Sequence, residues 1–142
     1  DMVKASKYFV NGSHPKSFAI ALIDFTDKCY PGEADLAIAR GVLMYLASGD
    51  LRNANHLMGE LKEHSRTKEI ELPNTPLLQF VKYLLLVLER DALPLFQILR
   101  KNYMSSINRD SFFNELLDEI AERFYGVHHR SGLQSILGDI FK

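Results

Sequence analysis

A row of ionisable side chains on one predicted helix is the first place in this sequence where chemistry could be sought. His56, Glu60 and His64 follow one another at four-residue intervals, a spacing that brings side chains to one side of an α-helix and could form a row of metal ligands. Successive members nevertheless drift by about 40° around the helix axis, because one turn holds about 3.6 residues. We therefore interpret the row as a solvated face opposite Leu57 and Leu61.

The other reactive side chains do not form a catalytic arrangement. Cys29 lies on an apolar stripe, which is typical of a buried and inert thiol. The neighbours His128 and His129 fit a flexible tail better than a metal site. Two carboxylate pairs are expected on helix surfaces: Asp24 with Asp27, and Asp118 with Glu122. Because no nucleophile–base pair, phosphate-binding glycine loop or cysteine pair occurs, we predict a protein that is not an enzyme and uses no cofactor or metal.

Size and charge narrow the function further. The chain has 142 residues, 46% of them hydrophobic, which suffices for one domain with a sizeable core. Its 17 basic and 18 acidic residues nearly cancel, so nothing supports nucleic-acid binding. A single cysteine excludes an internal disulfide and fits a reducing compartment. No signal peptide is visible, but the chain opens in mid-pattern at Asp1, so we interpret it as a fragment in which a missing leader means little.

Hydrophobic residues recur at helical spacing through the first half of the chain and predict four helices. Their expected boundaries are Asn11-Gly12, a Ser13 cap, a break at Tyr30-Pro31-Gly32, Gly49 and an Asp50 cap. The third helix starts near Glu33 and Asp35, whose charges suit a helix N-terminus. Its Gly41 is small enough to let another helix approach. The connector from His64 to Asn74 is polar, and the alternation in Glu69–Leu72 leaves a short strand open.

The stretch from Thr75 to Tyr103 is strongly apolar and is predicted to be the centre of the fold. Thr75 caps a helix that is apolar on nearly every side between Leu77 and Leu88, as a buried helix is. That run is far shorter than the ~18–20 residues that a bilayer requires, so we expect no stable membrane insertion. Asp91 is predicted to cap the next helix, on which four apolar residues recur at helical spacing: Leu95, Phe96, Leu99 and Tyr103.

The end of the chain divides into one more helix and a tail. After a linker at 105–108, an amphipathic helix runs from Phe112 to Phe124 and ends at Gly126. Residues 1–126 are therefore assigned to the helical domain and residues 127–142 to the tail. The tail has a short apolar face, which offers an alternative function as a peripheral membrane-associating module: Leu133, Ile136, Leu137, Ile140 and Phe141.

Antiparallel helical hairpins in series predict an all-α fold, a right-handed α–α superhelix of the α-solenoid type. One motif favours the tetratricopeptide-like form of this fold. Tyr45, Gly49, Ala54 and Met58 follow the spacing Tyr-x3-Gly-x4-Ala-x3-Phe, with methionine in place of the last aromatic residue. In this pattern the glycine forms the turn, the alanine permits a close helix crossing, and the two large residues fill the space between helices.

Several segments together resemble one known family, the fourth Golgi-to-ER-traffic factor ("Get-four"). The similarity extends from about Lys7 to Val127 and is most specific in LERDALPLFQILR and in SSINRDSFFNELLDEIAERFYGV. An earlier segment is similar to the middle of the family, HPKSFAIALIDFTDKCYPGEADLAIARGVLMYLASGDLRNAN. The resemblance identifies the chain as the C-terminal half of the family's superhelix, without the N-terminal half.

The resemblance implies a scaffold in the cytosolic delivery of tail-anchored membrane proteins to the endoplasmic reticulum. In this family the N-terminal half docks the targeting ATPase. The C-terminal half holds a ubiquitin-like partner subunit or, in animals, a large proline-rich BAG-family chaperone. We therefore expect a cytosolic protein whose late helices bind one of these partners.

Partner binding by helices needs apolar side chains that remain after the helices have packed together. The last two hairpins have such a surplus, although we expect about two-thirds of these side chains to be core. The candidate partner-binding residues are Tyr83, Leu86, Val87, Phe96, Leu99, Tyr103, Phe112, Phe113, Leu116 and Phe124.

Overall fold

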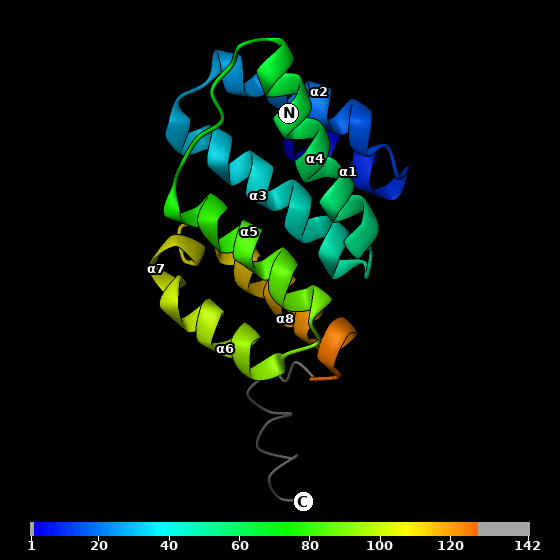
Figure 1. Ribbon diagram of the computed structural model, residues 1–142, viewed down its shortest axis with the longest axis vertical. Helices are drawn as coiled ribbons and strands as arrows, with labels where there is room; N and C mark the ends of the chain where they lie inside the picture. Colours follow the sequence, from blue (N-terminus) through cyan, green and yellow to red (C-terminus); the bar gives the residue numbers. More distant parts are fainter. Residues whose placement is uncertain (1, 128–142) are drawn as a thin grey trace, which may run out of the picture.

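The computed structural model describes residues 2–127, and this part of the chain consists of helices and their connections (Figure 1). The helices are α1 (Met2–Asn11), α2 (Pro15–Lys28), α3 (Pro31–Ala47), α4 (Leu51–Thr67), α5 (Pro76–Glu89), α6 (Leu93–Asn102), α7 (Met104–Ile107) and α8 (Ser111–Tyr125). The predicted all-α class is confirmed. The strand considered for Glu69–Leu72 does not form. Helix α4 runs three residues beyond His64 to Thr67, Lys68 and Glu69 form a turn, and residues 70–75 follow without regular structure.

Several helix ends follow the chemistry of their residues. The backbone N–H of Asn53 donates to Asp50 Oδ1 at 3.0 Å, and that of Leu78 donates to Thr75 Oγ1 at 3.5 Å, so both predicted caps are confirmed. Gly126 ends α8 in the left-handed conformation with φ of 70°. Each of these three boundaries was set by a residue whose side chain or backbone freedom satisfies the terminal groups of a helix.

Two predicted caps are wrong, and a predicted break begins a helix instead. Ser13 and Asp91 both adopt the left-handed region, with φ of 54° and 50°, and stand one residue before the N-cap. The cap positions belong to His14 and Ala92, neither of which makes a side-chain capping bond. At Tyr30-Pro31-Gly32, α3 already starts at Pro31, since proline suits the first position of a helix.

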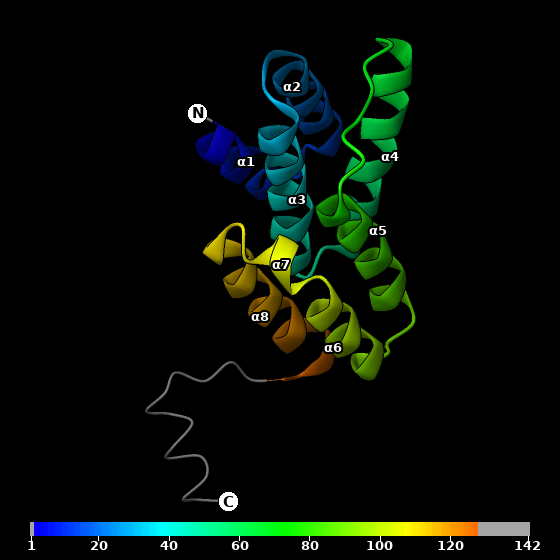
Figure 2. The same ribbon diagram turned by 90° about the vertical axis from the view of Figure 1, so that its left-hand side faces the viewer.

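The centre of the fold is α3, not the stretch from Thr75 to Tyr103 as the hydrophobic run predicted. Helix α3 contacts α1, α2, α4, α5 and α8, and it lies between them in both views (Figures 1 and 2). Small residues make this possible: a Cβ atom on Gly41 would lie 2.6 Å from Cζ of the buried Phe18. Small residues let other helices approach α3 on several sides, and this makes α3 central although α5 has more apolar residues.

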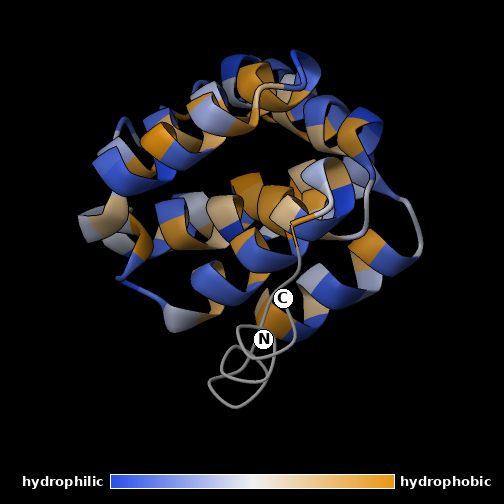
Figure 3. Ribbon diagram, turned by 90° about the horizontal axis from the view of Figure 1, so that it is seen from below, coloured by the Kyte–Doolittle hydropathy of each residue, from blue (hydrophilic) through white to orange (hydrophobic). Residues whose placement is uncertain are grey.

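The tetratricopeptide-like positions lie at the crossing of α3 and α4. Tyr45 is fully buried and its hydroxyl donates to the carbonyl of Phe9 at 3.4 Å, while burial raises its pKa to about 12. Gly49 forms the turn with φ of 81°, and Ala54 is fully buried. Met58 is only partly buried. Each of α1 to α5 contacts the next helix or the next but one, as in an α-solenoid. Hydrophobic and hydrophilic residues alternate along the helix ribbons, as amphipathic helices require (Figure 3).

Helix α8 departs from this stacking because it returns to pack against α3 (Figure 2). Two ion pairs hold this contact. Arg109 donates from Nη1 and Nη2 to the two carboxylate oxygens of Asp35 at 2.7 and 3.0 Å, and from Nη2 to the Gly32 carbonyl at 2.8 Å. Arg40 donates to Asp110 Oδ2 at 2.9 Å. Most of the predicted linker at 105–108 belongs to the short helix α7, whose Ile107 is buried.

Candidate partner-binding surface

Helix α5 has more apolar residues than its neighbours can cover. One side of the helix faces the core and buries six side chains: Leu77, Phe80, Val81, Leu84, Leu85 and Leu88. On the other side, Tyr83 is 48% exposed and Leu86 is 49% exposed, with Val87 half-buried between the two environments. A helix that is apolar on all sides but packed on only one therefore leaves a surplus at the surface.

Helix α6 adds a second set of exposed apolar side chains. Leu95 is 49% exposed and Ile98 is 56% exposed, three residues apart on a helix that contacts α5. On the packed side, Phe96 is buried with its ring 5.5 Å from that of Tyr125. Leu99 and Tyr103 are half-buried. We call Tyr83, Leu86, Leu95 and Ile98 the α5–α6 apolar group.

Burial divides the ten predicted partner-binding residues into three classes. Phe96, Phe113 and Leu116 are buried in the core. Their prediction as contact residues is therefore wrong, because a partner cannot reach them. Five are half-buried: Val87, Leu99, Tyr103, Phe112 and Phe124. Only Tyr83 and Leu86 are exposed, and the predicted set left out the two exposed apolar residues of α6, Leu95 and Ile98. Ile98 lies three residues after Leu95, on a different side of α6 from the buried Phe96. That helical spacing could have identified Ile98 as an exposed apolar residue.

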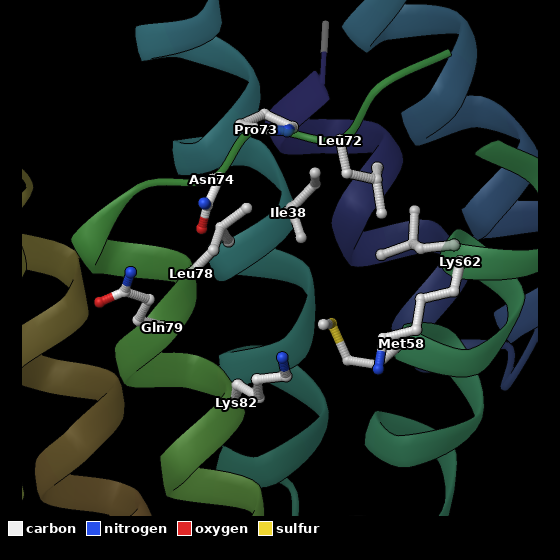
Figure 4. Close-up of a pocket in the computed structure, with 10 residues that line it drawn as sticks. Ile38, Met58, Lys62, Leu72, Pro73, Asn74, Leu78, Gln79 and Lys82 are labelled. Carbon is white, nitrogen blue, oxygen red and sulfur yellow. The ribbon is translucent and has the colours of Figure 1, made fainter. Parts of the chain in front are cut away.

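A cleft opens beside α5, where α3, α4, α5 and the connector 68–75 meet (Figure 4). It encloses about 570 Å³ of empty space, part of it open to solvent. Its apolar lining consists of Ile38, Met58, Leu61, Leu72, Pro73 and Leu78. Its polar lining consists of Lys62 and Lys82 with the amide side chains of Asn74 and Gln79. In Figure 4 the two lysines extend from opposite walls of the cleft.

The row His56, Glu60 and His64 forms a chain of side-chain contacts. Nε2 of each histidine lies 3.4 Å from a different carboxylate oxygen of Glu60. Among residues 2–127, no group of three histidine, cysteine or acidic side chains is placed to hold a metal ion. The predicted His128–His129 tail lies outside the described residues.

Cys29 is half-buried rather than buried, because it ends α2 beside the 68–75 connector instead of lying inside the α2 stripe. Partial burial and the nearby charge of Glu33 raise the pKa of its thiol, which disfavours the reactive thiolate. The predicted surface carboxylates also have partners: Asp24 pairs with Lys68 and Asp118 pairs with Arg100, each at 2.9 Å. These two ion pairs therefore link α2 to the residue after α4, and α6 to α8.

The comparisons with known proteins decide the family. The sequence model of the family described as Golgi to ER traffic protein 4 matches residues 1–141. The chain belongs to this family. The protein GET4 of Arabidopsis thaliana is 56% identical over 142 residues, which are 100% of this chain and 44% of that protein. The Golgi to ER traffic protein 4 homolog of Dictyostelium discoideum is 40% identical over 132 residues, 93% of this chain and 41% of that protein.

The fold of the Golgi to ER traffic protein 4 family is also found in a solved structure. The crystal structure of C. therm. Get4 matches with a TM-score of 0.77 and 23% identity, over 99% of this chain and 51% of that chain. This likeness supports the α-solenoid fold. The chain spans less than half the length of the two relatives above, and its assignment to the C-terminal half of the family stays a prediction. Within the described part of the chain, no helix has both the length and the apolar character needed to cross a membrane.

Proposed function

We propose that this chain is a non-catalytic scaffold segment in the cytosolic delivery of tail-anchored proteins to the endoplasmic reticulum. It binds a ubiquitin-like partner subunit, or a BAG-family chaperone in the same role, through its late helices. Docking of the targeting ATPase belongs, on this proposal, to the part of the family's length that this chain does not span. Family membership supports the pathway.

The observation that carries the binding site is the α5–α6 apolar group. Its four side chains are each about half exposed on two helices that contact one another. Large apolar side chains that remain at the surface of neighbouring helices suit a partner segment that buries them. The half-buried Leu99 on α6 and Tyr103 just after it would extend the contact with the partner segment.

A pull-down with the N-terminal segment of the ubiquitin-like partner tests this proposal. The full chain should capture the segment, and Leu86→Glu combined with Ile98→Glu should reduce capture by about tenfold or more, as loss of central anchors does. Ile20→Glu is the matched control, because Ile20 is a 37% exposed apolar residue on α2. The proposal is wrong if the folded double variant captures the segment as well as the unaltered chain.

A further inference from the structure

The cleft between α3, α4 and α5 lies beside Met58, the last residue of the tetratricopeptide-like motif. Where the tetratricopeptide spacing places an aromatic residue to fill the space between helices, this chain has Met58. Met58 is only partly buried and lines the cleft together with Ile38 and Leu72. Its flexible side chain leaves space and can adjust to different apolar groups, as methionines at binding surfaces do.

The charged side chains that line the cleft are both cationic. Lys62 and Lys82 are exposed at its edge, and neither makes an ion pair with any residue in the range 2–127. No carboxylate lines the cleft; Glu71 lines the adjoining cleft beside Cys29, which shares Leu72, Pro73 and Asn74 with it. An apolar interior with two unpaired ammonium groups complements a ligand that is apolar at its centre and negative at its sides.

We propose that this cleft binds a protein segment in which a large apolar side chain is flanked by aspartate or glutamate. The apolar side chain enters between Met58 and Leu78, and the carboxylates contact Lys62 and Lys82. Lys82 at the edge of the cleft and Leu86 of the α5–α6 apolar group are four residues apart on α5, so one partner segment could reach both. This inference rests on the proposed function and defines the chemistry of the partner segment.

Two short fluorescent peptides test the proposal with the full chain. In one, a leucine and a phenylalanine are flanked by glutamates, and in the other every glutamate is replaced by glutamine. Fluorescence anisotropy should show that the glutamate peptide binds about tenfold more tightly at low salt. Backbone amide chemical shifts of the labelled chain should change around Met58, Leu72 and Leu78.

Three variants separate the apolar and charged contributions. Met58→Phe should fill the cleft and weaken the glutamate peptide by about tenfold without lowering the melting temperature, because the change restores the residue type of the motif. Lys62→Glu with Lys82→Glu should weaken it by a similar factor, about tenfold. Lys7→Glu with Lys16→Glu is the control, since these exposed lysines lie on α1 and α2.

The possible results have distinct meanings. Equal affinity for the two peptides, or unchanged binding by both cleft variants, would overturn the proposal. Equal loss in the Lys7 and Lys16 control would also overturn it, because the attraction would then come from the overall charge. The proposed function fails separately, if Leu86→Glu with Ile98→Glu leaves partner capture intact while the cleft variants still weaken the peptide.

Discussion

Replacing Arg109 by alanine removes the cation that compensates a buried carboxylate. Asp35 is fully buried in α3, and its two oxygens accept hydrogen bonds from Arg109 at 2.7 and 3.0 Å. The same hydrogen bonds raise the pKa of the Arg109 guanidinium, which favours its charged form. Arg109→Ala leaves Asp35 as a charge without a partner in the interior.

The size of the effect follows from the exposure of the two groups. Breaking a buried ion pair by removing one member costs about 3–5 kcal/mol. The side chain of Arg109 is 34% exposed, so water already screens part of the pair, and we expect about 2–3 kcal/mol. That loss is large against the roughly 5–15 kcal/mol that separates most folded domains from their unfolded chains.

Urea unfolding followed by far-ultraviolet circular dichroism measures this loss. Arg40→Ala is the matched control, because it removes the other ion pair between α3 and the residues just before α8, Arg40 with Asp110, whose side chains are 15% and 25% exposed. The control should cost about 1 kcal/mol. Asp35→Leu combined with Arg109→Met should recover most of the loss, since no buried charge is then left alone. A loss for Arg109→Ala no greater than that of Arg40→Ala would refute the reasoning.

Gly41→Ala tests the packing of α3, and Gly59→Ala on α4 is its control. Gly41→Ala should cost about 1–3 kcal/mol of unfolding free energy, because its new methyl group would meet the ring of Phe18. Gly59→Ala, whose methyl group would meet nothing, should stabilise the fold by about 0.5–1 kcal/mol, and equal urea midpoints for the two variants would contradict this. Burial raises the pKa of Tyr45 to about 12, so the unfolded chain loses this proton first as pH rises above 10. The contribution of Tyr45 to the unfolding free energy should therefore be complete below pH 10 and be lost between pH 10 and 12. Tyr45→Phe should reduce the slope of the urea-derived unfolding free energy against pH in this range, and identical slopes for the two proteins would contradict the assignment.

The sequence predicted local features well because local chemistry decides them. Asp50, Thr75 and Gly126 mark helix ends by satisfying backbone groups close to them in the chain. Periodicity likewise identified helix faces, including the half-exposed Tyr83 and Leu86. Apolar content alone could not reveal which of two apolar faces another helix would cover, which is why Phe96 and Leu86 looked alike.

Long-range arrangement was beyond the sequence pattern. Asp35 was interpreted from its position near a helix start, whereas its partner Arg109 is 74 residues away. The central role of α3 depends on small residues such as Gly41, whose importance emerges only when Phe18 packs against them. The lysine-lined cleft depends in turn on the path of the 68–75 connector.

The return of α8 to α3 also affects when the chain can fold during its synthesis. A ribosome that has just completed α7 at Ile107 has released α3 with Asp35, but it has not yet made Arg109 or α8. Until Arg109 and α8 have emerged, the Asp35 carboxylate lacks its cation and one side of α3 stays in contact with water. Folding of this segment is therefore incomplete until α8 has been made, and nascent chains that stop before Ser111 are expected to remain targets for chaperones and proteases.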